Sequence, residues 1–356
     1  MIDLAHIRHT LAQYAHSTGT WPKPLAHVTD LLTLGAQLTS RHEFRGHITA
    51  GAVLVNHDGA VLHIRHKALG TWLRPGGHLE PEDTTRAEVP TDRVPFDLLP
   101  DGLRTAIEKQ AGPVQQVHTI DAGFNSAISA RVTTEQGAVF LKGLPADHPR
   151  IETLHREIVI NAHVTHVSPQ LLWHVQAEGW DVLAFEAING PHADYTSDGN
   201  LPLVADTLTR LSQMRAPDGL DLRLAEQRLA AFAPAGALPY FAGDALAHTD
   251  PNPTNVLISG GRAVLVDWAW ATRAAPWLDA AYWTLWLIAD GHTPEAAEHW
   301  AARIPAFRTA PTIGLNAFAS ANEQLWAGIA ADDPDPWTQR VHAAAKQWTA
   351  HRTRNS

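Results

Sequence analysis

The residues best suited to chemistry lie in His248-Thr249-Asp250-Pro251-Asn252-Pro253-Thr254-Asn255 and, twelve residues further on, at Asp267. The intervening stretch predicts a hairpin, because apolar runs at 256–258 and 263–266 flank Ser-Gly-Gly-Arg, which is typical of a tight turn. Such a hairpin would place Asp267 beside Asn255. Carboxylate and amide oxygens are the ligands that Mg²⁺ prefers, and a carboxylate such as Asp250 can orient an attacking hydroxyl. These types and this spacing predict magnesium-assisted phosphoryl transfer, which depends on positioning and charge neutralisation.

Asp-x-x-x-x-Asn is also the spacing of the kinase catalytic loop. On these residues the chain resembles the aminoglycoside phosphotransferase family, small-molecule kinases that carry His-Gly-Asp-x-x-x-x-Asn followed by Ile-Asp-Trp or Ile-Asp-Phe. The chain departs from this pattern at Thr249, where glycine is usual, and has Val266-Asp267-Trp268-Ala269 in place of Asp-Phe-Gly. The resemblance spans roughly residues 95–352. It implies an α+β, two-lobed protein-kinase-like fold with a small β-rich lobe and a larger helical lobe.

The resemblance also implies a role for each candidate residue. ATP, or alternatively GTP, would donate the phosphate, and Mg²⁺ would be the metal. The expected catalytic residues are Asp250, as base or positioning carboxylate, and His248, as a buttress of the loop. The expected metal ligands are Asn255 and Asp267. The residues expected to bind the nucleotide are Lys142, Glu157, Ser126 and, through the backbone of the hinge, Glu186 and Ile188.

The phosphate-binding lysine needs a strand and a helix to hold it and its partner. Lys142 ends the apolar strand predicted over 137–142. In the predicted helix over 151–158, Leu154 and Ile158 are four residues apart and mark the buried face. Glu157 lies at the border of that face and is the expected partner of Lys142. Glu152 competes for this role, but a first-turn glutamate is typical of a solvated helix start.

Elements on both sides of these residues follow from the hydrophobic pattern. Further strands are predicted over 114–120, 127–133, 171–175 and 182–186, and helices over 103–110, 204–214, 222–232, 277–289 and 294–301, with three more helical stretches ending near Arg352. Five tryptophans follow the metal aspartate, and core packing is the favoured role for most of them. Trp268 and Trp270 are the two that could instead line an acceptor pocket, because aromatic faces hold sugar rings and nucleobases.

Composition excludes several classes of protein. The chain has 356 residues, 45% hydrophobic and 18% charged, which is ordinary for a globular protein. A formal net charge of −10 leaves no overall basic field to attract nucleic acid. Cysteine is absent, so disulfides and thiolate metal sites are excluded. The most apolar helical run, 277–289, is too short to span a bilayer, and the N-terminus has no signal-peptide pattern, so we expect a cytoplasmic protein.

The N-terminal part has a different character. Segments 47–55 and 60–66 predict a hairpin, and Gly70 to Asp83 looks like the opening of a Nudix hydrolase, with Trp-x-x-Pro-Gly-Gly followed by Glu-Pro. The glutamate-rich helix that holds magnesium in that family is not completed here. We therefore expect a truncated Nudix-like module without hydrolase activity over 1–92, then a kinase-like N-lobe with the hinge over 93–190 and a helical C-lobe over 191–356.

The phosphate acceptor is expected to be a hydroxyl on a small molecule. The family habit favours an antibiotic, with self-protection as the purpose, and a nucleoside or sugar metabolite is the alternative. A cationic acceptor would require acidic residues, which Asp194, Asp198 and Asp244 could supply. Two rival functions stay open: a Nudix-type pyrophosphohydrolase, and a pseudokinase that binds nucleotide or a partner without transfer. The N-terminal extension could mediate a homodimer.

Overall fold

The computed structural model describes residues 49–51, 64–65, 72–73, 76–78, 93–120 and 126–354. The chain divides into two compact units, Met1–Pro90 and Thr91–Ser356, which are described separately. In the first unit β1 (Thr49–Gly51) pairs antiparallel with β4 (Gly76–His78), and β2 (Ile64–Arg65) pairs with β3 (Trp72–Leu73).

The pairing of β1 with the Gly-Gly segment of β4 was not predicted from the sequence. The hairpin predicted between 47–55 and 60–66 falls largely outside the described residues and stays a prediction. The predicted helices before residue 43, and the rest of the Nudix-like segment, lie outside the described residues and stay predictions.

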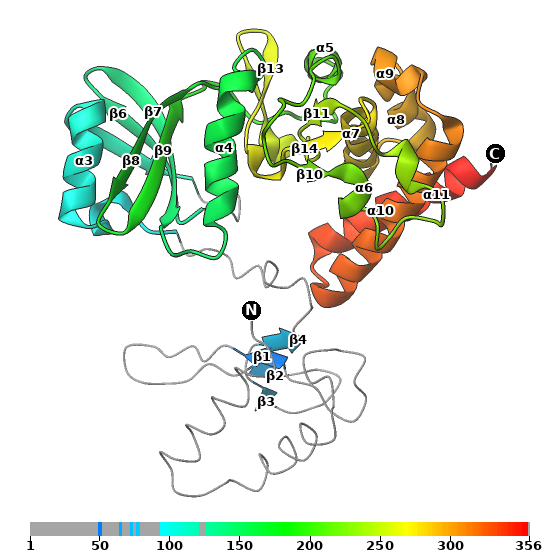
Figure 1. Ribbon diagram of the computed structural model, residues 1–356, viewed down its shortest axis with the longest axis horizontal. Coiled ribbons are helices and arrows are strands. Elements are labelled where there is room, and N and C mark those ends of the chain that lie inside the picture. The colour runs from blue at the N-terminus through cyan, green and yellow to red at the C-terminus, as the bar shows by residue number, and fades with distance from the viewer. Residues whose placement is uncertain are drawn as a thin grey trace, which may run out of the picture. The chain divides into compact units, whose positions relative to one another are not determined.

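The second unit begins with a lobe built on a five-stranded antiparallel sheet in the order β5-β6-β7-β9-β8 (Figure 1). Its strands are β5 (Val114–Thr119), β6 (Ile128–Thr134), β7 (Gly137–Pro145), β8 (Leu171–Ala177) and β9 (Trp180–Glu186). Before the sheet come the 3-10 turn η1 (Phe96–Leu98) and helix α3 (Asp101–Ala111), and α4 (Ile151–Val164) connects β7 to β8. The sequence predicted each of these strands and both helices.

Alternation along β9 explains why the sheet is covered on both faces. Val182 packs in a buried cluster that contains Leu103 of α3. Its neighbour Leu183 packs in another cluster, which contains Leu154 of α4. The sheet therefore lies between the two helices, as Figure 1 shows, and α4 is the helix on the side of the second lobe.

Short strands connect the sheet lobe to the helical lobe. The hairpin of β12 (Val256–Ser259) and β13 (Arg262–Leu265) has the predicted register, and a three-stranded sheet in the order β10-β14-β11 lies beside it. The bounds of its strands are β10 (Arg223–Leu224), β11 (Ala245–Ala247) and β14 (Thr272–Ala274). Three 3-10 turns, η2 (Leu238–Tyr240), η3 (Pro253–Asn255) and η4 (Trp268–Trp270), complete this region.

The helical lobe is formed by α5 (Leu201–Ser212), α6 (Ala225–Arg228), α7 (Leu278–Ala289), α8 (Pro294–Ala301), α9 (Pro305–Arg308), α10 (Thr312–Asp332) and α11 (Pro336–Arg354). The helix predicted over 222–232 is wrong in length, because 223–224 pair with β14 and leave only the short α6. Buried aromatic side chains hold the lobe together, with Phe318 in edge-on contact with Trp277 and Trp348. Core packing of the tryptophans is confirmed at Trp277 and Trp283, which are buried.

The α+β class and the division into a sheet lobe and a helical lobe, in the order expected for a protein-kinase-like fold, are confirmed for the described part of the chain. Within that same part, no helix has both the length and the apolar character required to cross a membrane.

Candidate active site

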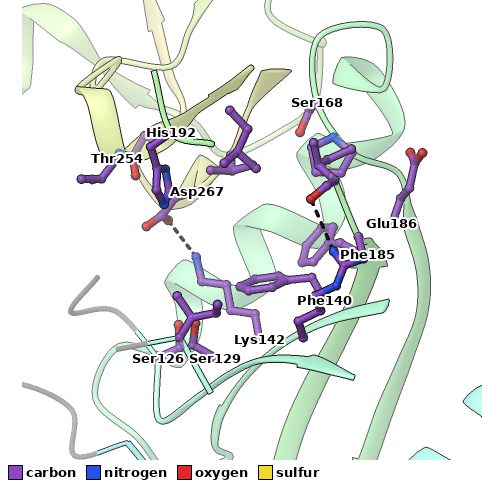
Figure 2. A pocket seen from close by; sticks show the side chains of 18 of the residues that line it. Ser126, Ser129, Phe140, Lys142, Ser168, Phe185, Glu186, His192, Thr254 and Asp267 are labelled. Carbon is purple, nitrogen blue, oxygen red and sulfur yellow. Dashed lines mark hydrogen bonds and ion pairs between the residues drawn. The ribbon is translucent and has the colours of Figure 1, made fainter. Parts of the chain in front are cut away.

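A cleft of about 430 Å³ lies between the sheet and the β12–β13 hairpin. Seven of the nine expected site residues line it: Ser126, Lys142, Glu157, Glu186, Ile188, Asn255 and Asp267. In Figure 2, Lys142 points towards Asp267 at one end, with Ser126 on the same side, while Glu186 lies at the other end. The cleft therefore has a charged end and a hinge end.

Lys142 is the central charge of the first end. Its Nζ lies 2.5 Å from Glu157 Oε1 and 2.8 Å from Asp267 Oδ1. Lys142 and Glu157 are both buried, at 7% and 4% exposure. Burial acts to lower the pKa of Lys142, but the carboxylates of Asp267 and Glu157 outweigh it and hold that pKa above its usual value. Lys142 is therefore a fixed ammonium group, and Glu157 rather than Glu152 is its helix partner.

The second carboxylate of the site, Asp250, is held by two asparagine amides. Asn252 Nδ2 donates to Asp250 Oδ1 at 3.0 Å, and Asn255 Nδ2 donates to Asp250 Oδ2 at 2.9 Å. Asn252 is itself fixed as the cap of η3, because its Oδ1 accepts from the backbone of Thr254 at 2.8 Å. Burial raises the pKa of Asp250 to about 6, against the hydrogen bond from Asn252. A carboxylate with such a pKa is suited to accept a proton near neutral pH.

Asn255 and Asp267 are brought together by a backbone hydrogen bond. Val266 donates its N–H to Asn255 O at 2.9 Å, so the hairpin brings Asp267 beside Asn255 as predicted. Because Asn255 uses its amide nitrogen on Asp250, its Oδ1 is the atom left for a metal ion. Asp267 has a left-handed backbone, with φ 65°, which only a constrained position stabilises in a non-glycine residue.

This pair of oxygen donors suits a hard cation. In the part of the chain that the structure describes, no cluster of three or more His, Asp or Glu side chains forms a complete metal site. Asn255 and Asp267 would therefore hold Mg²⁺ together with oxygens from the nucleotide phosphates and water, as is usual when magnesium binds with its substrate.

His248 connects the two loops of the site by hydrogen bonds. Its Nε2 lies 2.9 Å from Val266 O, and its Nδ1 accepts from the backbone of Asp250 at 3.3 Å, so the proton is assigned to Nε2. Burial lowers the pKa of His248 to about 4. The neutral ring packs edge-on against Trp268, with centroids 4.7 Å apart. The geometry thus supports the expected buttress between the two loops, and not a proton-transfer role.

Thr249 stands in a conformation that favours glycine. Its φ of 66° is rare for a β-branched residue and costs roughly 1–3 kcal/mol. Asp279 Oδ1 accepts from the Thr249 backbone at 2.7 Å, and Asp279 Oδ2 accepts from the His248 backbone at 3.0 Å. Arg228 Nη1 donates to Thr249 Oγ1 at 2.6 Å and to Thr272 Oγ1 at 2.7 Å. These contacts offset the strain and fix the residue that precedes Asp250.

The hinge end is shaped by a residue that the sequence did not single out. Arg131 of β6 donates from Nη2 to Asn189 Oδ1 at 2.7 Å and from Nη1 to Ile188 O at 3.5 Å. Phe140 and Leu257 line the cleft between the two ends. An apolar slot with a hydrogen-bonding backbone at its end is suited to a flat heteroaromatic base.

Tyr195 is a second residue that the sequence did not single out. Its buried hydroxyl donates to Pro251 O at 2.6 Å and supports the loop that carries Asp250. It also lines a separate open hollow of about 580 Å³ together with Asp194 and Asp290. A single tyrosine outside any periodic pattern carried no signal from which this role could be predicted.

The other candidates for the acceptor site are placed as follows. Trp268 lines the cleft, and its Nε1 donates to Ser168 Oγ at 3.0 Å. Trp270 contacts the guanidinium groups of Arg223 and Arg228, which lie 4.8 and 5.3 Å from its ring centroid. Asp244 pairs with Arg215 at 3.1 Å, and Asp198 is exposed. Of the three acidic candidates, Asp194 lines the hollow that Tyr195 also lines.

Family models and curated protein sequences show no match to the chain. Among solved structures, an aminoglycoside phosphotransferase from Alicyclobacillus acidocaldarius is similar at 16% identity, with 74% of this chain and 97% of that chain covered and a TM-score of 0.49. A choline kinase from Streptococcus pneumoniae is similar at 14% identity over 70% and 99% of the two chains, with a TM-score of 0.46. A putative fructosamine-3-kinase from Haemophilus somnus is similar at 12% identity over 69% and 96%, with a TM-score of 0.48. At such identity, the acceptors of those proteins do not carry over to this chain.

Proposed function

We propose that the protein is a small-molecule kinase that transfers the γ-phosphate of ATP or GTP to a hydroxyl group. One observation carries the proposal: Lys142, Glu157, Asn255 and Asp267 come from four separate segments and line the same cleft. Such a convergence of a buried ammonium group with oxygen donors for a cation is what phosphoryl transfer requires.

Each residue would have a role that follows from its position in the cleft. Lys142 would bind the phosphates near the start of the triphosphate chain, because Glu157 fixes its ammonium group at the charged end. Asn255 and Asp267 would hold Mg²⁺, which neutralises the charge of the phosphates. The base would lie between Phe140 and Leu257 and reach the hinge backbone at Glu186 and Ile188. Adenine and guanine both fit this description.

Asp250 would orient the acceptor hydroxyl and take its proton. The hydroxyl oxygen forms a bond to the γ-phosphorus, while the bond from that phosphorus to the β–γ bridging oxygen breaks and leaves the nucleoside diphosphate. Asn252 and Asn255 hold the Asp250 carboxylate in place for this step. The pKa of about 6 leaves the carboxylate largely ionised at neutral pH.

The acceptor would be a small molecule, either an antibiotic that the cell inactivates or a nucleoside or sugar metabolite. The observation that bears on this choice is the hollow lined by Asp194, Asp290 and Arg340 next to Tyr195, which suits a polar acceptor. Phosphorylation as self-protection is the purpose we infer if the acceptor is an antibiotic.

The test is transfer of label from γ-labelled ATP or GTP, with Mg²⁺, to a panel of hydroxyl-bearing antibiotics, nucleosides and sugars. Asp250→Asn serves as the matched control, because it keeps the size of the side chain. Label in one acceptor with wild type and none with the variant would support the proposal. Nucleotide binding without transfer to any acceptor would favour the pseudokinase alternative, and hydrolysis of nucleoside diphosphate derivatives that survives Asp250→Asn would favour the Nudix alternative.

A further inference from the structure

Arg93 brings a guanidinium group into the nucleotide cleft from the segment that precedes the sheet. It lines the cleft together with Ser126 and Lys142. Its Nη1 donates a hydrogen bond to Ser126 O, and the backbone of Val94 donates to Ala127 O at 2.9 Å. The segment is therefore bonded to the chain just before β6, at the charged end of the cleft.

The position of Arg93 is fixed by packing as well as by hydrogen bonds. Val94 packs against the buried clusters on both faces of the sheet, and Phe96 packs against the cluster that contains α3. Arg93 itself is half-buried. A long side chain that starts from an anchored backbone loses less freedom on binding a ligand than one on a loose segment.

Even with the Mg²⁺ proposed at Asn255 and Asp267, the balance of charge at this end leaves a role for a further cation. Lys142 is shared by two carboxylates, Glu157 at 2.5 Å and Asp267 at 2.8 Å, so these three groups sum to one negative charge. A triphosphate adds several more negative charges. In the described lining of the cleft, lysine and arginine also occur at Arg93 and Arg131, and Arg131 is bonded to the hinge at the opposite end.

We propose that Arg93 is a phosphate-binding residue for the nucleotide, a role that rests on the nucleotide site proposed above. A guanidinium group has five N–H donors in a planar fork, so it can donate to Ser126 O and to phosphate oxygens together. Arg93 is thus a substrate-contacting residue supplied by the chain that leads into the sheet lobe. From the sequence, Arg93 lies at the start of the predicted kinase-like N-lobe and has no expected role in the site.

The test compares binding of a nucleoside with its mono-, di- and triphosphate, in the adenosine and the guanosine series. Full-length wild type, Arg93→Ala, Arg93→Gln and Arg93→Lys are titrated by calorimetry with and without Mg²⁺. Arg93→Gln can keep a donor for Ser126 O while it removes the charge. We expect the Ala and Gln variants to bind the triphosphate about 10- to 100-fold more weakly and the free nucleoside unchanged. Arg93→Lys should recover part of the loss.

Arg131→Ala is the matched control, because it removes a cation from the hinge end of the same cleft. Its effect should be equal for nucleoside and triphosphate. If Arg131→Ala lowered the affinity for triphosphate relative to nucleoside as much as Arg93→Ala does, the effect would come from the overall charge of the cleft. That result would overturn the proposal. An unchanged ratio of triphosphate to nucleoside affinity in both the Ala and Gln variants of Arg93 would also overturn it.

A structural role for Arg93 gives a separate result. The Ala variant would then lose affinity for nucleoside and triphosphate alike, the Gln variant would restore both, and the proposal would fall. If wild type binds no nucleotide, the nucleotide site itself fails, and Arg93 with it. If wild type binds triphosphate but phosphorylates no acceptor, the kinase activity fails, while the phosphate dependence of the Arg93 variants still decides this inference.

Discussion

The ionisation of Asp250 should control both activity and stability, in opposite directions with pH. Burial raises its pKa from 3.8 to about 6. If Asp250 acts as base, kcat/KM for the acceptor at saturating nucleotide should be constant above about pH 7 and fall tenfold per pH unit below about pH 6. His248 does not contribute to this fall, because burial holds its pKa at about 4.

The same shift has a consequence for folding. The folded protein keeps the Asp250 proton to a higher pH than the unfolded chain, so this group favours folding below about pH 4 and ceases to do so as the pH rises through about 6. The interval from 3.8 to about 6 corresponds to roughly 3 kcal/mol. Asp279, whose pKa burial also raises to about 6, adds a slope of the same sign.

A comparison with Asp250→Asn isolates the residue, because Asp279 is present in both proteins. The assay is denaturant unfolding of wild type and variant at pH 4 and pH 7.5. The free energy of unfolding of the variant relative to wild type should rise by roughly 2.4 kcal/mol between the two pH values, because the unfolded chain is already partly ionised at pH 4. A difference that is the same at both pH values would refute the buried, ionised state assigned to Asp250.

Titration of Glu157 could produce a pH dependence of activity similar to the one expected for Asp250. Burial raises its pKa to about 7, against the attraction of the Lys142 ammonium. Protonation of Glu157 would release Lys142 and raise KM for the nucleotide, whereas protonation of Asp250 lowers turnover with nucleotide already bound. Measurement of both parameters against pH separates the two. A fall that appears only in KM for the nucleotide would assign the titration to Glu157.

Three further substitutions test the residues that hold the candidate site in place. Arg228→Ala should lower kcat about 10-fold with little change in KM for nucleotide, because Thr249 loses the 2.6 Å hydrogen bond that helps hold its positive φ. Steady-state kinetics measure both parameters. Adding Thr249→Gly should restore kcat, because glycine adopts a positive φ without strain. Tyr195→Phe should cost about 1–2 kcal/mol in denaturant unfolding, since the carbonyl of the catalytic loop loses its 2.6 Å donor; an unchanged midpoint would contradict it. Gly190→Ala should abolish nucleotide binding, as measured by calorimetry, or separate the hinge from β12, because a Cβ there would lie 1.9 Å from Ile258 O. Wild-type affinity would show that the hinge is not closely packed.

Residue spacing gave the signal from which most of the candidate site was predicted. Asp250, Asn255 and Asp267 follow from one short motif and one hairpin, and the hairpin has the predicted register. Glu157 follows from helical periodicity, since the border of a buried face points to where a partner of Lys142 should lie. These are local signals, and the structure brings all of these residues to one place.

Residues that act through tertiary contacts gave no such signal. Arg131 reaches the hinge only because β6 pairs beside β7 in the sheet, and Tyr195 meets the catalytic loop 56 positions further along the chain. The helix predicted over 222–232 has good periodicity, but pairing of Arg223 and Leu224 with β14 overrides it. The roles assigned to the site residues stay predictions until nucleotide binding and transfer are measured.

The ion pair between Lys142 and Asp267 makes the first step of nucleotide binding an exchange. A cation on Asp267 would weaken its bond to Lys142, 2.8 Å away, and Lys142, which keeps Glu157 at 2.5 Å, would then attract a new anion. A metal ion alone supplies no such anion, and a nucleotide alone leaves Asp267 without a cation. Either ligand by itself is therefore disfavoured, so metal and nucleotide should bind as one unit.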